Sequence, residues 1–186
     1  MLFPNESEGT KAIHMTKHKI STKRITLDAI LTALALIIFV VELQLPEIVP
    51  IPGVKLGLAN VITLVAVFEL GPVDALIILL LRIGMGSMFT GRVMALLYSL
   101  AGGMLCFLVT FLLKRIVTKS QIWVCGVIGA IAHNIGQILV AILITQTPAL
   151  VGYLPLLTVS AIITGAFTGG IATYISKRMH GFFARY

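Results

Sequence analysis

The chain has 186 residues, of which 58% are hydrophobic and only 11% are charged, with a mean hydropathy of +1.05 and a formal net charge of +7. Soluble globular domains are about 45–50% apolar and about 25% charged, so this chain has too little polar surface for a water-facing globule. The composition argues against a soluble enzyme, a disordered regulator and a nucleic-acid-binding domain. The apolar segments are long, and polar and apolar residues do not alternate within them. They therefore predict an all-α integral membrane protein.

A polar, basic stretch, residues 1–24, precedes the first apolar segment, and Met15 is an alternative start that leaves the native status of residues 1–14 open. Six apolar segments follow, each a candidate transmembrane helix. They cover Thr26–Leu43, Leu56–Leu70, Val73–Phe89, Val93–Leu113, Ile122–Thr145 and Leu150–Ile175. The second and third are short for a bilayer, with a tight connection at Gly71-Pro72. The predicted organisation is a tail (1–24), a six-helix membrane domain (25–176) and a basic tail (177–186).

The basic residues predict the orientation of these segments. Eleven of the fourteen Lys and Arg residues lie in the N-terminal tail, in the link after the fourth segment and in the C-terminal tail. Six spans place these regions on one side, which the positive-inside rule assigns to the cytoplasm. We therefore predict cytoplasmic termini and a multi-pass protein of the cell membrane. Orientation and attraction to anionic lipid explain the net charge without a nucleic-acid partner.

Motifs for energy conversion or catalysis are missing from the sequence. The chain has no Gly-Lys pair and hence no P-loop, and none of its seven acidic residues are adjacent, so no Asp-rich magnesium–diphosphate motif exists. No local pattern suggests Ser-His-Asp or Cys-His catalysis or a metal site. We predict that the chain is not an enzyme and holds no metal, and that Cys106 and Cys125 are buried free thiols.

Arg82 is the clearest charge within a predicted span. It lies about nine residues into the third segment, close to mid-membrane at about 1.5 Å per residue, where a charge is costly. Two glycines follow it on the way to Ser87 and allow close backbone approach. The guanidinium either binds an anion in a pocket, or serves as a structural ion pair, with Glu42 as candidate partner, or as a snorkelling side chain.

A second polar cluster lies in the fifth segment, at His133, Asn134 and Gln137. His133 and Gln137 are four residues apart and share a helix face that continues through the small residues Ala130 and Gly126. Such a face is unlike a lipid-facing surface. It is interpreted either as interhelical hydrogen bonding or as a ligand contact, with a metal or proton relay as a minor alternative.

The outer half of the membrane domain is predicted to be mildly cationic. Lys55 lies at the outer entrance of the second segment and Arg92 at the outer end of the third, where each is either an interfacial anchor or a ligand contact. Together with Arg82 they would favour phosphate, diphosphate or carboxylate. The candidate ligand-binding residues are Lys55, Asn60, Arg82, Ser87, Arg92, His133, Asn134 and Gln137.

Small residues four apart predict two helix-contact faces. Ala29 and Ala33 share one face of the first segment, and Gly165 and Gly169 share one face of the sixth. Internal packing is the simplest explanation for each.

Several motifs in chain order carry a family resemblance: Gly53–Asn60, Arg82–Ser87, Leu100–Gly103, Ala132–Gln137, and Thr147–Leu150 with Tyr153–Pro155. Over about residues 25–175 they resemble the Gx transporter family, often labelled heptaprenyl diphosphate synthase component I. That family is similar to the substrate-binding S-components of energy-coupling factor (ECF) transporters. The resemblance implies six helices, cytoplasmic termini and a ligand bound toward the outer face. Ala29 and Ala33 match the Ala-x-x-x-Ala face by which S-components contact the coupling subunit.

The function implied is a membrane-embedded S-component for uptake of a small anionic or amphipathic nutrient or cofactor precursor. Its partners would be a coupling transmembrane subunit, two ATPase subunits that use the ATP, the lipid bilayer and the substrate, with no cofactor in this chain. The alternatives are a membrane accessory subunit of prenyl diphosphate or quinone metabolism, and a stand-alone channel or exporter. The synthase label fits poorly, because the chain lacks the magnesium-binding carboxylates of such enzymes.

Overall fold

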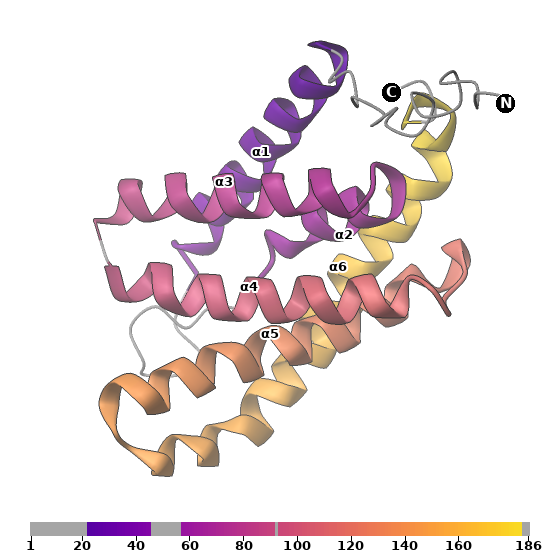
Figure 1. The fold of residues 1–186 in the computed structure, drawn as a ribbon. Coiled ribbons are helices and arrows are strands. Elements are labelled where there is room, and N and C mark those ends of the chain that lie inside the picture. The colour runs from indigo at the N-terminus through magenta and orange to yellow at the C-terminus, as the bar shows by residue number, and fades with distance from the viewer. Residues whose placement is uncertain (1–21, 46–56, 92, 184–186) are drawn as a thin grey trace, which may run out of the picture.

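The computed structural model describes residues 22–45, 57–91 and 93–183, and this part of the chain contains helices and no strands (Figure 1). The α-helices are α1 (Thr22–Glu42), α2 (Asn60–Glu69), α3 (Pro72–Thr90), α4 (Val93–Leu113), α5 (Ile122–Thr145) and α6 (Leu154–Phe183). Two 3-10 helices, η1 (Lys119–Gln121) and η2 (Pro148–Tyr153), precede α5 and α6.

Within the described ranges, five helical segments are long and apolar enough to cross a membrane: α1, α3, α4, η1 with α5, and η2 with α6. The predicted spans agree with these helices to within about four residues, except at the C-terminal end of α6. That helix continues to Phe183, so part of the predicted C-terminal tail is helical. Lys177 and Arg178 lie in this extension, where cations near a helix C-terminus are favourable. The described residues thus fold into helices without strands, and the apolar helices have the character of a multi-pass membrane protein.

Helix α2 is shorter than predicted. Its ten residues measure about 15 Å at about 1.5 Å per residue, half of the roughly 30 Å hydrocarbon core. It begins at Asn60 because Gly57 adopts a left-handed backbone, with φ of 77°, which interrupts helical continuation toward Leu56.

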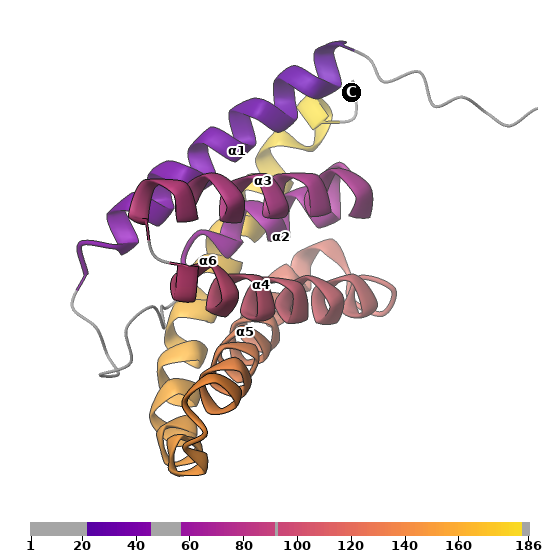
Figure 2. The ribbon, with the colours of Figure 1, turned by 60° about the vertical axis from the view of Figure 1, so that its left-hand side comes forward.

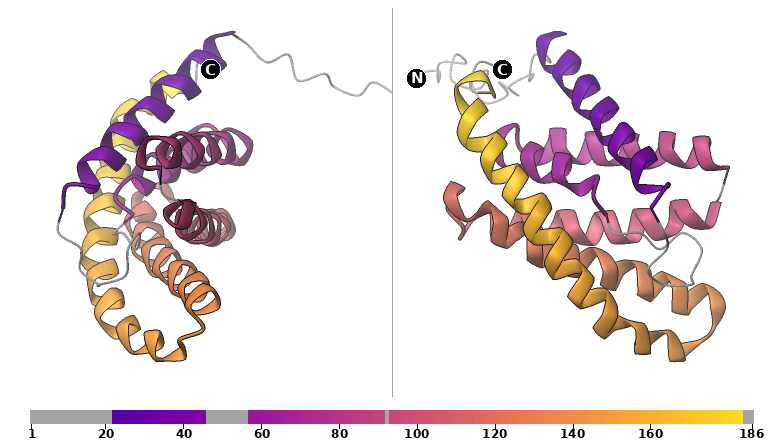
Figure 3. Two further views of the ribbon diagram at one scale, coloured as in Figure 1. Left: turned by 90° about the vertical axis from the view of Figure 1, so that its left-hand side faces the viewer. Right: turned by 180° about the vertical axis from the view of Figure 1, so that it is seen from behind.

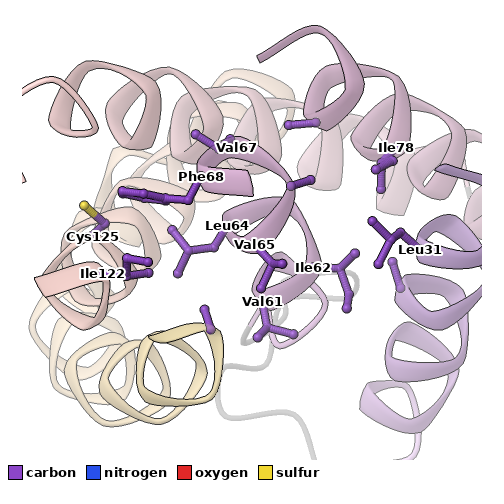
Figure 4. Packing of buried hydrophobic residues seen from close by; sticks show 14 of the residues in the cluster. Leu31, Val61, Ile62, Leu64, Val65, Val67, Phe68, Ile78, Ile122 and Cys125 are labelled. Carbon is purple, nitrogen blue, oxygen red and sulfur yellow. The ribbon is translucent and has the colours of Figure 1, made fainter. Parts of the chain in front are cut away.

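Helix α2 forms the centre of the bundle. Every residue from Val61 to Phe68 is buried, as expected for a helix that is apolar on all sides. Figure 4 shows its side chains contacting α1 and α3 on one side and α5 on the other. The surrounding residues of this core cluster are Leu27, Leu31 and Ala35 of α1, Ala75 and Ile78 of α3, Ile122 and Cys125 of α5, and Ala172 of α6.

Helices α4, α5 and α6 approach one another through glycines. A Cβ atom on Gly126 would lie 2.5 Å from the Gly165 carbonyl oxygen and 2.5 Å from Gly169 Cα, and one on Gly136 would lie 2.7 Å from the Ala101 oxygen. The small-residue face of the sixth segment is therefore used for internal packing. Figure 3 shows α6 crossing the back of the molecule beside α5. These contacts hold the polar face of α5 against its neighbours.

Two ion pairs, Arg24–Asp74 and Lys119–Glu69, lie at one end of the bundle. Arg24 Nε donates to Asp74 Oδ1 at 3.0 Å, and Lys119 Nζ lies 3.2 Å from Glu69 Oε1. Lys114 Nζ donates to the Val67 carbonyl at 2.6 Å, and burial lowers the pKa of this ammonium, an effect that nearby Glu69 opposes. The start of α1 and the end of α6 lie at this same end (Figures 1 and 2).

Candidate ligand-binding site

Polar side chains gather halfway along the helices, inside the apolar bundle. Arg82 is the eleventh of nineteen residues in α3, and His133 is the twelfth of twenty-four in α5. Both are buried, with exposed fractions of 4% and 3%, and Asn60 at the start of α2 is buried with them. A buried charge is stable only when charges or hydrogen bonds compensate it, so the partners of Arg82 define the site.

A hydrogen-bonded chain links α3, α2 and α5. Arg82 Nη2 donates to Asn60 Oδ1 at 3.2 Å, and Asn60 Nδ2 lies 3.1 Å from His133 Nδ1. Because a guanidinium only donates, the amide oxygen must face Arg82 and the amide nitrogen must face the histidine. His133 Nδ1 then accepts, which places the imidazole proton on Nε2. This direction of donation, from Arg82 to Asn60 and from Asn60 to His133, determines the orientation of the amide and the tautomer of the imidazole.

Two glycines enclose His133. A Cβ on Gly57 would lie 2.8 Å from Asn60 Nδ2 and 3.0 Å from His133 Cδ2, and one on Gly102 would lie 2.9 Å from His133 Cε1. A Cβ on Gly102 would also lie 2.9 Å from Gln137 Cγ. Sequence reasoning did not single out these glycines as positioning residues, although both lie within the motifs that carried the family resemblance.

Glu42, at the end of α1, connects to the same site. It is 5% exposed and accepts a hydrogen bond from the Gly57 N–H at 2.5 Å. Its charge acts on Arg82 through space. Two of the three interpretations of Arg82, the anion-binding one and the ion-pair one, therefore have structural support, since a cavity borders the side chain and Glu42 supplies an opposite charge.

Two cavities adjoin the hydrogen-bonded chain. The first, between α1, α3 and α4, encloses about 250 Å³ of atom-free space, partly open, and the second, between α2, α4, α5 and α6, about 370 Å³. Each has closed room for only about one or two water molecules, so any larger ligand would require the helices to move apart. The first is lined by Phe39, Arg82, Ile83, Ser87, Ala95, Leu96 and Ser99. The second is lined by Gly57, Asn60, Thr63, Leu64, Cys106, Thr110, Cys125, Gly126, Ala130, Thr164 and Thr168.

The structure brings most of the predicted residues together. Asn60, Arg82 and His133 form the chain, Gln137 is fully buried beside them, and Ser87 lines the cavity of Arg82 while its hydroxyl donates to the Gly84 carbonyl at 2.7 Å. Asn134 is separate, because its Nδ2 donates to the Leu157 carbonyl of α6 at 2.9 Å.

The remaining two predicted ligand residues, Lys55 and Arg92, lie outside the described residues. The prediction that Cys106 and Cys125 are buried free thiols is confirmed.

Sequence reasoning missed the threonines of the second cavity. Thr164 and Thr168 donate to carbonyls of their own helix, whereas the buried Thr63 hydroxyl has no hydrogen-bond partner within the described part of the chain. Isolated threonines in apolar helices carry no signal of their own, because bonding to the preceding turn satisfies them without a ligand.

The sequence model of a family described as heptaprenyl diphosphate synthase component I matches residues 31–175. The chain belongs to this family. No curated protein and no solved structure matches the chain significantly. The match spans the polar chain from Asn60 to His133 and the helices around it, so the site lies within the part that the family shares. The family description names a synthase component and assigns no residue of this site.

Proposed function

We propose that this chain is the substrate-binding S-component of an ECF-type uptake transporter for a small nutrient or cofactor precursor that carries an anionic or amphipathic group. The observation that carries the proposal is the Arg82–Asn60–His133 chain, buried halfway across an apolar bundle and bordered by two cavities. Polar groups at that depth are costly and are typical of substrate pathways. ATP hydrolysis would belong to two partner ATPase subunits, since the sequence has no P-loop.

The outward face of α1 supports a docking role. Ala29 and Ala33 are both exposed, and the large side chains around them, such as Ile30 and Ile37, are exposed as well. Two small residues on an exposed apolar helix allow a partner helix to approach closely. This face is the proposed contact with the coupling transmembrane subunit.

The proposed topology has six crossings with cytoplasmic termini, in the cell membrane. Arg24–Asp74 and Lys119–Glu69 bring the start of α1, the α2–α3 turn and the α4–α5 connection to one end. That arrangement requires the chain between α1 and α3 to return across the bundle, with α2 as a short crossing that is shielded from lipid. The positive-inside rule places this end in the cytoplasm.

Co-purification with the coupling subunit tests the docking role. Ala29→Leu and Ala33→Leu should abolish association, because each adds a branched side chain where helices must approach. Ala166→Leu is the matched control, since Ala166 is also exposed, on α6. Unchanged association of both α1 variants, or equal loss in the control, would count against this docking face.

Cysteine labelling in intact cells tests the topology. A membrane-impermeant maleimide should label Gln146→Cys, between α5 and η2, and should leave Ser120→Cys in η1 unlabelled until the cells are opened. Both positions are exposed, and the native cysteines are buried. The reverse labelling pattern would place the ion-paired end outside.

The family description favours a second candidate, a membrane accessory subunit of prenyl diphosphate metabolism. This role predicts that a soluble synthase, and no ATPase pair, co-purifies with the chain. Native mass spectrometry of the gently purified protein would separate the two candidates, because it reports both bound ligand and bound partner. Magnesium-dependent condensation by the purified chain alone would favour an enzyme over both.

A further inference from the structure

The buried arginine Arg82 has one edge of its guanidinium that meets no carboxylate among the described residues. A guanidinium binds a carboxylate with two parallel N–H groups, and the Nε and Nη2 hydrogens form one such fork. On Arg82, Nη2 donates to the neutral amide oxygen of Asn60 at 3.2 Å, and Nε has no hydrogen-bond partner among the described residues. This side chain is 4% exposed, so bulk water does not satisfy that donor.

The same edge is filled elsewhere in the molecule. Arg24 Nε donates to Asp74 Oδ1 at 3.0 Å and its Nη2 donates to Oδ2 at 2.5 Å. Arg24 therefore shows how this fork binds a carboxylate in this chain. Beside Arg82, the equivalent position holds one amide oxygen, and the Arg82 side chain lines a cavity together with Ser87 and Ser99.

We infer that the Nε/Nη2 edge of Arg82 receives a carboxylate of the ligand, and that Asn60 occupies this edge only while the site is empty. This inference rests on the proposed function and specifies its substrate class as a monocarboxylate. Binding of the ligand releases the Asn60 amide from Arg82. Since the same amide also bonds His133, the ligand is coupled to the contact between α2 and α5.

The charge around the site favours one carboxylate over a diphosphate. Among the described residues, Glu42 is the carboxylate whose charge opposes that of Arg82, and the two groups carry no net charge when both are ionised. A single carboxylate adds one negative charge to the interior, whereas a diphosphate adds two or more. Each uncompensated charge in a medium of low dielectric constant is costly.

Nuclear magnetic resonance of the full chain, with ¹⁵N at arginine Nε, tests the inference in detergent micelles. The Arg82 and Arg24 signals are assigned with Arg82→Lys and Arg24→Lys. The probes are formate and acetate, the smallest monocarboxylates, with neutral formamide, inorganic phosphate and pyrophosphate as comparators. We expect a saturable shift of the Arg82 Nε–H signal by the two carboxylates in the millimolar range, as ligand efficiency allows for so few atoms. Arg24, whose edge is filled, is the internal control and should not shift.

Three results would overturn the inference: no saturable shift of Arg82 with formate or acetate, an equal shift with phosphate, pyrophosphate or formamide, or equal shifts of Arg24 and Arg82. The proposed function is judged separately, by association with the coupling subunit. If the Arg82 signal does not shift with carboxylates while the Ala29 and Ala33 face of α1 still binds that subunit, the substrate class is wrong and the transport role stands. If Arg82 binds formate but no coupling subunit associates, the carboxylate site stands and the transport role is wrong.

Discussion

Two arginines of this chain use the same edge of the guanidinium in different surroundings. Arg24 lies at the ion-paired end with its side chain 28% exposed, and both nitrogens of its edge bind the Asp74 carboxylate. Arg82 lies halfway along the bundle, 4% exposed, and its edge meets one neutral amide. Because Arg24 still reaches water, although the Asp74 side chain is only 6% exposed, direct pairing of these two charges holds the helix ends together at a lower cost than a fully buried pair would.

The buried position of Arg82 has a different energetic consequence from the pairing of Arg24. Breaking a buried ion pair costs about 3–5 kcal/mol, yet replacing both charges by apolar groups is often neutral or stabilising. Arg82 is therefore poorly suited to a purely stabilising role, particularly because its Nε has no hydrogen-bond partner among the described residues. The comparison supports the proposal that the Arg24–Asp74 site serves the fold and that the Arg82 site binds a ligand.

The largest expected effect comes from removing the compensating charge of the central site. Glu42→Ala leaves Arg82 as an uncompensated buried charge and the Gly57 N–H without its acceptor, and should cost about 3 kcal/mol or more. The double variant Glu42→Ala/Arg82→Met should recover most of that loss. Thermal unfolding in detergent measures both; a single variant as stable as the native chain would show that Glu42 does not compensate Arg82.

A smaller loss of stability is expected at Gly102, where the backbone of α4 lies close to His133. Gly102→Ala places a Cβ 2.8 Å from the His133 carbonyl oxygen, and overpacking of this kind costs about 1–3 kcal/mol. Gly84→Ala on α3 is the matched control, because nothing lies within 4 Å of its Cβ position. The control should be neutral or slightly stabilising, since alanine favours helix by up to about 1 kcal/mol. Equal stability of the two variants would contradict the proposed constraint on His133.

The helical segments were largely predictable from the sequence, because long apolar runs indicate helices directly. The length of α2 was not, since α2 follows a left-handed backbone at Gly57, whose N–H binds Glu42 fifteen residues away. The site was predictable as residue types: Arg82, His133 and Asn60 stand out as polar groups in apolar segments. That Asn134 leaves this cluster for the Leu157 carbonyl depends on where α6 packs, which helix periodicity does not determine.

A single substitution should convert the central arginine site into the arrangement of the end site. Asn60→Asp offers Arg82 a carboxylate from within the chain, as Asp74 does for Arg24. We expect the affinity for formate at Arg82 to fall at least about tenfold, or about 1.4 kcal/mol, because the edge is filled. Titration of the Arg82 Nε–H signal measures this change, with Asn60→Ala as the comparison that empties the edge and should bind formate at least as tightly as the native chain.

The smallest effect is expected at the end site. Asp74→Asn removes the charge of a pair whose arginine still reaches water, so the loss should stay near or below about 1 kcal/mol and shrink as salt increases. The same salt series should leave the loss caused by Glu42→Ala almost unchanged, because buried charges are screened much less. Thermal unfolding of both variants at low and high ionic strength measures the contrast. Similar salt dependence at the two sites would mean that water reaches Arg82 as freely as Arg24, and the functional interpretation of the central arginine would lose its physical basis.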